Sequence, residues 1–339
     1  MTRLSTLARS GWRQTRRLPL RLAVRYVAPE RPRRFPTSIQ IEATSKCNLR
    51  CPSCSHSREA GAGEHLTPDI LETIIDRLPF TPAIVRLSGI GEPLLNPQFL
   101  TLVDALTARN IDCDFITNGT MLTPTMREEL LSRPSIAEVI ISCDGAHKET
   151  FERCRLGASF ERWCEFVGDF LAETNRDPRP TLRITSSTVA SRQNLGEIAD
   201  VIRFGARLGF DRMMILAPIP VDEISASLCP SSAEMATVSR DRLEATAAAA
   251  GVEIGCAFAR SSVPPVSIPR CLQPWEGLFI RATGDVSSCC ALFGSDRASV
   301  MGNILEQDFA AIWCGERFGE FRRTSASGTN ALCRVCPYY

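Results

Sequence analysis

The chain has 339 residues, of which 44% are hydrophobic and 23% are charged, the balance of an ordinary globular protein. Its formal net charge of +1 creates no global field that would favour nucleic acid or a membrane as a partner. No apolar run of about 18 residues would cross a membrane, and no secretory signal is recognisable. Fifteen cysteines without a signal for an oxidising compartment therefore indicate metal or cluster ligation and a cytoplasmic location.

Residues 1–36 form a separate compositional block, with ten arginines against one acidic residue, Glu30. Three interpretations of this N-terminal extension stay open: a solvated extension, a patch for an anionic partner, or an organelle presequence. We assign it no role.

Residues 37–220 alternate apolar runs with amphipathic segments. The apolar runs predict strands at 38–44, 83–89, 113–118, 138–144, 181–189 and 212–218. Helices fit the segments 67–78, 97–109, 123–131, 160–174 and 194–208, two of which begin with a Thr-Pro pair suited to a helix start. This alternation predicts an α/β fold, a partial (β/α)6 TIM-like barrel, with its chemistry at the C-terminal ends of the strands.

The pattern changes after residue 220. Residues 221–262 are predicted to link two domains through one helix, which begins at a Ser231–Glu234 capping box and stops at Gly251. Residues 263–339 are rich first in proline and then in cysteine. We expect a second, small domain there, held together by metal because its core would be small.

The stretch "CNLRCPSC" carries Cys47, Cys51 and Cys54 directly after the first predicted strand. A structural zinc site needs four ligands, usually as two pairs, and this spacing is not a pair. A four-iron cluster held by only three thiolates leaves one iron open to a substrate or cofactor. The missing fourth cysteine is thus interpreted as a binding position.

With these cysteines, the sequence resembles the radical S-adenosylmethionine (SAM) superfamily. "SGIGEP" after the second strand is similar to its glycine-rich SAM-binding loop, and "ITNGT" and "ISCDG" end the third and fourth strands at family positions. The resemblance implies a [4Fe–4S] cluster on the three cysteines, with SAM bound to it. Ser53 departs from the family, which usually has an aromatic or large residue there that lies near the adenine. The SAM-binding residues implied are Gly89, Gly91, Glu92, Asn118, Ser142, Arg155 (with Arg153 as the alternative) and Val189.

A second cysteine set lies near the C-terminus. The sequence around these cysteines, from "CLQPWEGLFIRATGDVSSCC" to "CRVCPYY", resembles the auxiliary-cluster domain called SPASM, in its shortened "twitch" form. A hairpin turning at "ATGD" would bring the first two ligands together. The resemblance implies one auxiliary [4Fe–4S] cluster, while a structural zinc site is the alternative. Its expected ligands are Cys271, Cys289 (with Cys290 as the alternative), Cys333 and Cys336.

By resemblance, the protein cleaves SAM to methionine and a 5′-deoxyadenosyl radical, which takes a hydrogen atom from a small substrate. An external one-electron donor such as flavodoxin or ferredoxin is implied. A carbohydrate-like substrate is favoured over a peptide, because the region before the first strand is short for a leader-binding domain. Oxidation of an alcohol to a ketone is the first hypothesis, with the auxiliary cluster as electron acceptor.

Three alternatives stay open. A redox-neutral epimerase would use Cys256 or Cys229 as hydrogen donor, a peptide-modifying maturase would act on a larger substrate, and a metal-binding protein without catalysis would leave SAM intact. The other cysteines are interpreted as buried apolar residues.

Overall fold

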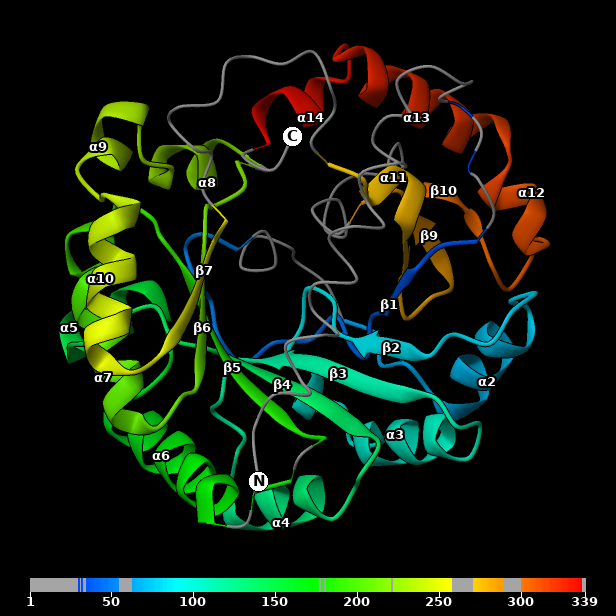
Figure 1. The fold of residues 1–339 in the computed structure, drawn as a ribbon. Coiled ribbons are helices and arrows are strands. Elements are labelled where there is room, and N and C mark those ends of the chain that lie inside the picture. The colour runs from blue at the N-terminus through cyan, green and yellow to red at the C-terminus, as the bar shows by residue number, and fades with distance from the viewer. Residues whose placement is uncertain are drawn as a thin grey trace, which may run out of the picture.

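The computed structural model describes residues 30, 32, 35–54, 63–176, 178–179, 181–220, 222–257, 271–289 and 300–336. One curved, ten-stranded sheet runs through them in the order β10-β9-β8-β1-β2-β3-β4-β5-β6-β7 (Figure 1). The strands are β1 (Ser38–Ile41), β2 (Ile84–Leu87), β3 (Asp112–Thr117), β4 (Ile136–Ser142), β5 (Arg183–Val189), β6 (Arg212–Leu216), β7 (Glu253–Ala257), β8 (Gly277–Ile280), β9 (Asp285–Ser287) and β10 (Val300–Asn303).

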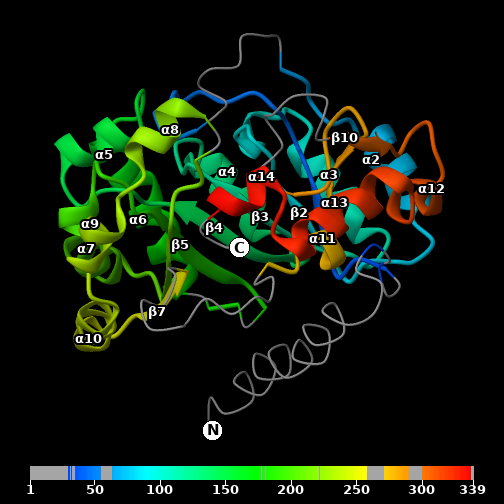
Figure 2. The same ribbon diagram turned by 90° about the horizontal axis from the view of Figure 1, so that it is seen from above.

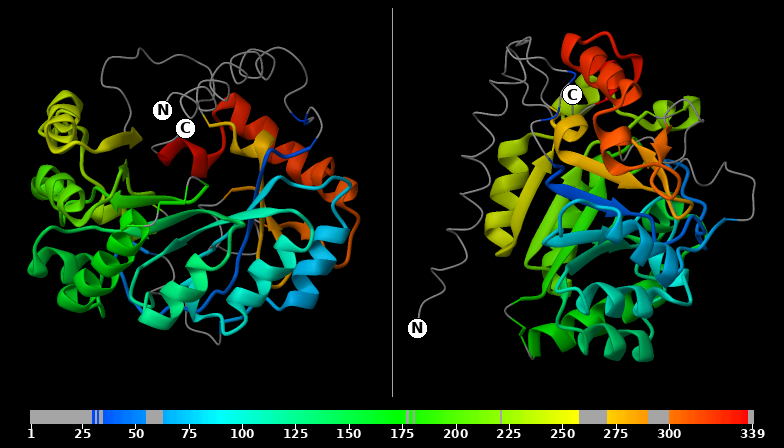
Figure 3. Two further views of the ribbon diagram at one scale, coloured as in Figure 1. Left: turned by 60° about the horizontal axis from the view of Figure 1, so that its bottom comes forward. Right: turned by 90° about the vertical axis from the view of Figure 1, so that its right-hand side faces the viewer.

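Strands β1 to β7 are all parallel, and helices cover the convex side of the sheet (Figures 1 and 3). This confirms the predicted partial α/β barrel. The helices of this region are α2 (Pro68–Asp76), η2 (Pro93–Leu95), α3 (Phe99–Thr107), α4 (Pro124–Leu131), α5 (Lys148–Cys154), α6 (Phe160–Arg176), η3 (Leu195–Glu197), α7 (Ile198–Leu208), α8 (Glu223–Leu228), α9 (Ser232–Ala236) and α10 (Arg240–Ala250).

The single helix predicted between residues 231 and 251 is wrong. The chain there forms two helices, because Ser231 caps α9 and a second serine, Ser239, caps α10 by accepting a hydrogen bond from the Arg242 amide. Strand β7 then follows Gly251 and pairs with β6, which adds a seventh parallel strand that the sequence pattern did not reveal.

The two faces of the sheet differ in chemistry. On the convex face, Met213 lies against Gly205 of α7 in the buried apolar core. Residues one position away alternate to the concave face, and several there are charged. Arg86 of β2 forms a two-point ion pair with Asp114 of β3, with nitrogen–oxygen distances of 2.5 and 3.0 Å. The concave face of the barrel therefore carries charged side chains in this region.

The C-terminal region continues the same sheet. Strand β8 pairs in parallel with β1 and forms an antiparallel hairpin with β9, whose turn contains Gly284 at a φ of +84°. The predicted hairpin is thus confirmed, whereas its place beside β1 was not predicted. Helices also pack on this side of the molecule (Figure 2). They are α11 (Gln273–Glu276), α12 (Phe309–Trp313), α13 (Glu316–Ser327) and α14 (Ala331–Val335).

Among the helices that the structure describes, none is both long and apolar enough to cross a membrane. Helix α11 packs against both β8 and α13. The predicted domain boundaries at residues 36 and 220 stay predictions, and the one at residue 263 falls outside the described residues.

Candidate functional site

The cluster loop, which we define as residues 45–54, leaves the C-terminal end of β1 and carries Cys47, Cys51 and Cys54. Within it, the Leu49 amide lies 3.4 Å from the Cys47 sulfur, and the Cys54 amide donates to the Cys51 carbonyl at 3.0 Å. The three predicted ligands therefore lie on one short loop at the predicted edge of the sheet.

The glycine-rich loop after β2 packs directly against the cluster loop. The Glu92 amide donates to the Lys46 carbonyl at 2.8 Å. A Cβ atom at Gly91 would lie only 2.3 Å from the Thr44 carbonyl oxygen and 2.4 Å from that of Lys46. Glycine is needed here because any side chain would push the two loops apart.

Glu92 is 2% exposed, and its carboxylate accepts hydrogen bonds from other groups of the protein. One oxygen accepts from the Thr117 hydroxyl at 2.6 Å and from the Leu94 amide at 3.3 Å, and the other accepts from the Asn118 amide at 2.6 Å. Burial raises the pKa of Glu92 to about 7 despite these bonds. Glu92 thus ties the end of β2 to the end of β3, and a contact with the SAM ammonium group stays a prediction.

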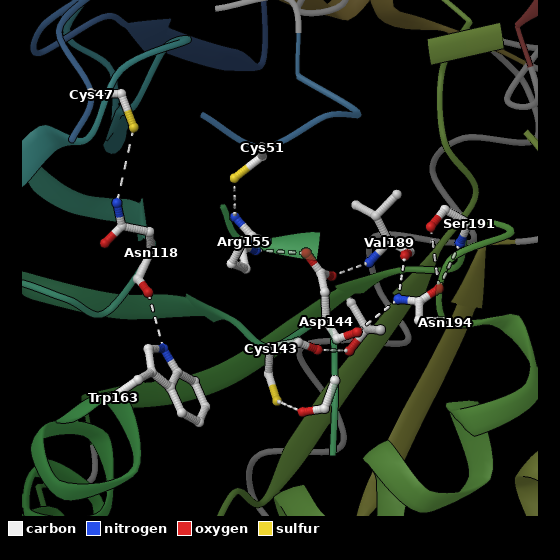
Figure 4. Close-up of polar contacts among 12 residues, drawn as sticks. Cys47, Cys51, Asn118, Cys143, Asp144, Arg155, Trp163, Val189, Ser191 and Asn194 are labelled. Carbon is white, nitrogen blue, oxygen red and sulfur yellow. Dashed lines mark hydrogen bonds and ion pairs between the residues drawn. The ribbon is translucent and has the colours of Figure 1, made fainter. Parts of the chain in front are cut away.

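Two side chains from neighbouring elements approach the cysteine sulfurs (Figure 4). The Asn118 side-chain amide lies 4.0 Å from the Cys47 sulfur, and the Arg155 guanidinium lies 4.0 Å from that of Cys51. Trp163 of α6 fixes the Asn118 backbone by donating to its carbonyl at 3.0 Å. Both donors face sulfurs that would carry negative charge as thiolates.

Arg155 also pairs with Asp144, as Figure 4 shows, at a nitrogen–oxygen distance of 2.6 Å. The other Asp144 oxygen accepts from the Val189 amide at 2.7 Å, which joins the ends of β4 and β5. The alternative residue, Arg153, instead contacts Thr150 and the Gln193 carbonyl. Of the two arginines, Arg155 is therefore the one beside the cysteines.

Ser142 and Gly89 lie at the same edge of the sheet. Ser142 ends β4 and is buried, whereas a Cβ atom at Gly89 would meet the Glu42 side chain at 2.4 Å. The structure thus places all seven residues expected around SAM at the C-terminal ends of β2 to β5 or in the segments that follow these strands. Their roles toward SAM stay predictions.

Two residues of this network were missed by sequence reasoning. Asn194 donates to the carbonyls of Asp144 and Val189, at 2.9 Å each. Glu42, just after β1, accepts from the Ile90 amide at 3.2 Å and from the Ala282 amide at 3.3 Å. Glu42 therefore connects the glycine-rich loop to the β8–β9 hairpin. Its only signal in the sequence is an acidic residue at the end of an apolar strand.

The chemistry of the cluster loop fits an iron–sulfur cluster. Burial, together with the charges of Glu92, Cys51 and Cys54, raises the pKa of Cys47 to about 11. The three thiols of the loop become stable thiolates when positive iron neutralises them. When bound there, a [4Fe–4S] cluster would be held by these three residues and would keep one iron open for SAM.

The auxiliary ligands come from separate segments. Cys271 precedes α11, Cys289 follows β9, Cys333 lies in α14 and Cys336 just after it. Cys333 contacts the Ser325 hydroxyl, at an oxygen–sulfur distance of 3.3 Å. Four thiols would suit a cluster with only protein ligands, and this ligand set stays a prediction. The alternative ligand Cys290 falls outside the described residues.

No three His, Cys, Asp or Glu side chains converge on a single-ion site in the described ranges. Each cysteine of an iron–sulfur cluster binds its own iron atom, so cluster ligands do not need to meet at one point.

The two candidate hydrogen donors lie in different places. Cys229 follows α8 on the loops after β6, where its sulfur lies 3.3 Å from the Ser225 carbonyl oxygen. Cys256 pairs in register with Ile215, which belongs to the convex core, so its side chain points to the helices. Burial raises the pKa of Cys256, while Arg240 of α10 lowers it and Glu244 of the same helix raises it. This orientation disfavours Cys256 as a donor and leaves Cys229.

Known proteins match both regions. The sequence profile of the radical SAM superfamily matches residues 41–205, and that of the SPASM iron–sulfur cluster-binding domain matches residues 271–337. The AdoMet-dependent heme synthase of Methanosarcina barkeri is 28% identical over 332 residues, covering 89% of each chain.

Two solved structures share the fold. Streptococcus suis SuiB bound to the precursor peptide SuiA has a TM-score of 0.68 and 16% identity, covering 96% of this chain and 76% of SuiB. BtrN in complex with AdoMet and 2-DOIA has a TM-score of 0.54 and 18% identity, covering 89% of this chain and 93% of BtrN. At these identities the likeness concerns the fold.

Proposed function

Because the chain belongs to the radical SAM superfamily and carries a SPASM iron–sulfur domain, we propose that it oxidises an alcohol of a small polar substrate to a ketone. When bound, the first [4Fe–4S] cluster and SAM supply a 5′-deoxyadenosyl radical, which removes the hydrogen atom from the carbinol carbon. The alcohol then loses its hydroxyl proton and one further electron as the C=O bond forms. The auxiliary cluster, when bound, supplies the acceptor for that electron.

The observation that carries this proposal is the shared sheet. Strand β1, which leads into the cluster loop, pairs directly with β8, which leads into the hairpin before Cys289. Glu42 adds a side-chain connection between the glycine-rich loop and the same hairpin. Both cysteine sets therefore flank strands of one continuous sheet, which supports electron transfer between the two sites.

The polar concave face supports a small hydroxylated substrate. Besides the Arg86–Asp114 pair, Glu138 of β4 accepts from the Thr185 hydroxyl at 2.5 Å. Carboxylates of this kind can accept hydrogen bonds from substrate hydroxyl or amino groups. A carbohydrate-like compound such as an aminocyclitol is therefore the proposed substrate class. BtrN, whose structure holds 2-DOIA, has a similar fold.

The test uses anaerobically reconstituted protein with SAM, dithionite and a panel of aminocyclitols and sugars. We expect 5′-deoxyadenosine together with a product that has lost two hydrogen atoms. A Cys333→Ala/Cys336→Ala variant should still cleave SAM but lose the ketone, whereas the exposed Cys314→Ala control should keep both activities. A ketone formed at wild-type rate by the double variant would contradict the proposed acceptor.

Epimerisation is the second candidate, favoured by the position of Cys229 on the loops after β6. It predicts a product of unchanged mass that takes up one deuterium from heavy water, and loss of this uptake in Cys229→Ala. The Cys256→Ala variant serves as control, because that side chain points to α10.

A peptide or cofactor substrate is the third candidate. It is favoured by the fold shared with SuiB, whose structure holds the peptide SuiA, and by similarity to the heme synthase. Formation of 5′-deoxyadenosine only when peptides replace the small molecules would favour this candidate over the first.

A further inference from the structure

Helix α13 carries a serine that contacts one of the proposed auxiliary ligands. Ser325 is 1% exposed, and its hydroxyl oxygen lies 3.3 Å from the Cys333 sulfur. A thiolate bound to iron has no proton, so in a loaded site the hydroxyl is the donor of this hydrogen bond. Neighbouring Ser327, in contrast, bonds to the Thr324 carbonyl and to Thr329 on the exposed side.

The backbone around Cys333 is fixed by the same helix. The amides of Thr329 and Asn330 donate to the Thr324 carbonyl, at 3.0 and 3.1 Å. The Asn330 side chain then accepts from the Cys333 amide at 3.2 Å and donates to the Thr324 hydroxyl at 3.2 Å. These hydrogen bonds therefore hold Cys333 at a set position relative to Ser325, and the contact between the two side chains follows from the structure of this turn.

One helical turn before Ser325, Arg322 anchors α13 to the segment of the first auxiliary ligand. Arg322 is 0% exposed, and its guanidinium donates to the Pro274 carbonyl at 2.8 Å, three residues after Cys271. It also donates to the Trp313 carbonyl at 2.7 Å and lies 4.4 and 4.2 Å from the ring centres of Trp313 and Phe318. Helix α13 thus connects the segments that carry Cys271 and Cys333.

Hydrogen bonds to cluster sulfurs change reduction potentials, because they stabilise the more negative, reduced form. We propose that Ser325 is a positioning residue of the auxiliary site, whose hydroxyl donates to the Cys333 thiolate and raises the reduction potential of the cluster. This inference rests on the proposed function, since it takes Cys333 as a cluster ligand. A higher potential would make the cluster a better acceptor for the substrate electron.

The test is an EPR-monitored redox titration of the full chain carrying Cys47→Ala, Cys51→Ala and Cys54→Ala, in which only the auxiliary cluster gives a signal. Ser325→Ala should shift the midpoint potential to a more negative value. A tenfold change in the equilibrium constant for reduction corresponds to about 59 mV for one electron. Ser325→Thr, which keeps the hydroxyl, and Ser327→Ala should leave the potential near that of the parent.

A second measurement detects the contact in the parent protein itself. Pulsed EPR of the reduced parent in heavy water should detect an exchangeable deuteron coupled to the cluster, and a folded Ser325→Ala variant should lack this coupling. An unchanged potential in Ser325→Ala, or a parent without this coupling, would overturn the inference even with the cluster loaded. Absence of iron from the parent would overturn the auxiliary site itself, and the proposed acceptor with it.

Discussion

The barrel site draws its three cysteines from eight consecutive residues, whereas the four auxiliary cysteines are spread over residues 271–336. The first set lies on one loop braced by the ends of the neighbouring strands, through Gly91, Glu92 and Asn118. The second set depends on a helix, α13, which contacts two of the ligand segments through Arg322 and Ser325. A substitution beside one site should therefore impair that site and leave the other largely intact.

The largest effect is expected from Gly91→Ala, which damages the support of the barrel site. The added methyl group would overlap the carbonyl oxygens of Thr44 and Lys46, at 2.3 and 2.4 Å, so the cluster loop must move. A misplacement of about 1 Å near a reacting centre can cost on the order of 100-fold in activity. We expect SAM cleavage, measured as 5′-deoxyadenosine, to fall at least that far. Gly196→Ala is the control, because a methyl group there meets nothing within 4 Å.

Arg322→Ala damages the support of the auxiliary site instead. It removes a buried side chain from between two aromatic rings and leaves the Pro274 and Trp313 carbonyls without their donor. The expected loss of stability is about 4 kcal/mol, measured by urea unfolding, with auxiliary iron lost before barrel iron. Arg323→Ala, which removes an exposed pair with Glu320, should change stability by less than about 0.5 kcal/mol. Equal loss of iron from both sites would show that they are not supported separately.

Glu92 gives a smaller, pH-dependent effect. Burial raises its pKa from 4.5 to about 7, so the folded state holds the proton more tightly than the unfolded state does. The protein is therefore stabilised by this group below pH 4.5, and the contribution is lost as the pH rises to about 7. The total is on the order of 3 kcal/mol.

Urea unfolding between pH 4.5 and 8 tests this sign. The stability of wild type relative to Glu92→Gln should fall across that range, and Glu128→Gln serves as the matched variant at an exposed position. A constant difference between wild type and Glu92→Gln would contradict a raised pKa.

The contrast between the sites also explains what the sequence could predict. The cluster loop is contiguous and follows an apolar strand, so both its chemistry and its position at the sheet edge could be predicted. The glycine-rich loop follows the next strand, so the parallel sheet brings it to the same edge. The strand alternation itself predicted the barrel.

Long-range contacts were out of reach of such patterns. Pairing of β1 with β8 and the bond from Ala282 to Glu42 join residues about 240 positions apart, and no local periodicity records them. The orientation of Cys256 could not be predicted for a related reason. Without a predicted strand over residues 253–257, no alternation in the sequence indicates that Cys256 lies on the convex face.

The most direct test of two separate sites is the iron and sulfide content after anaerobic reconstitution. It compares wild type with the Cys47→Ala/Cys51→Ala/Cys54→Ala variant. Two four-iron clusters predict about eight irons in wild type and about four in the variant. About four irons in wild type and none in the variant would contradict the account, because the C-terminal cysteines would then hold no iron–sulfur cluster.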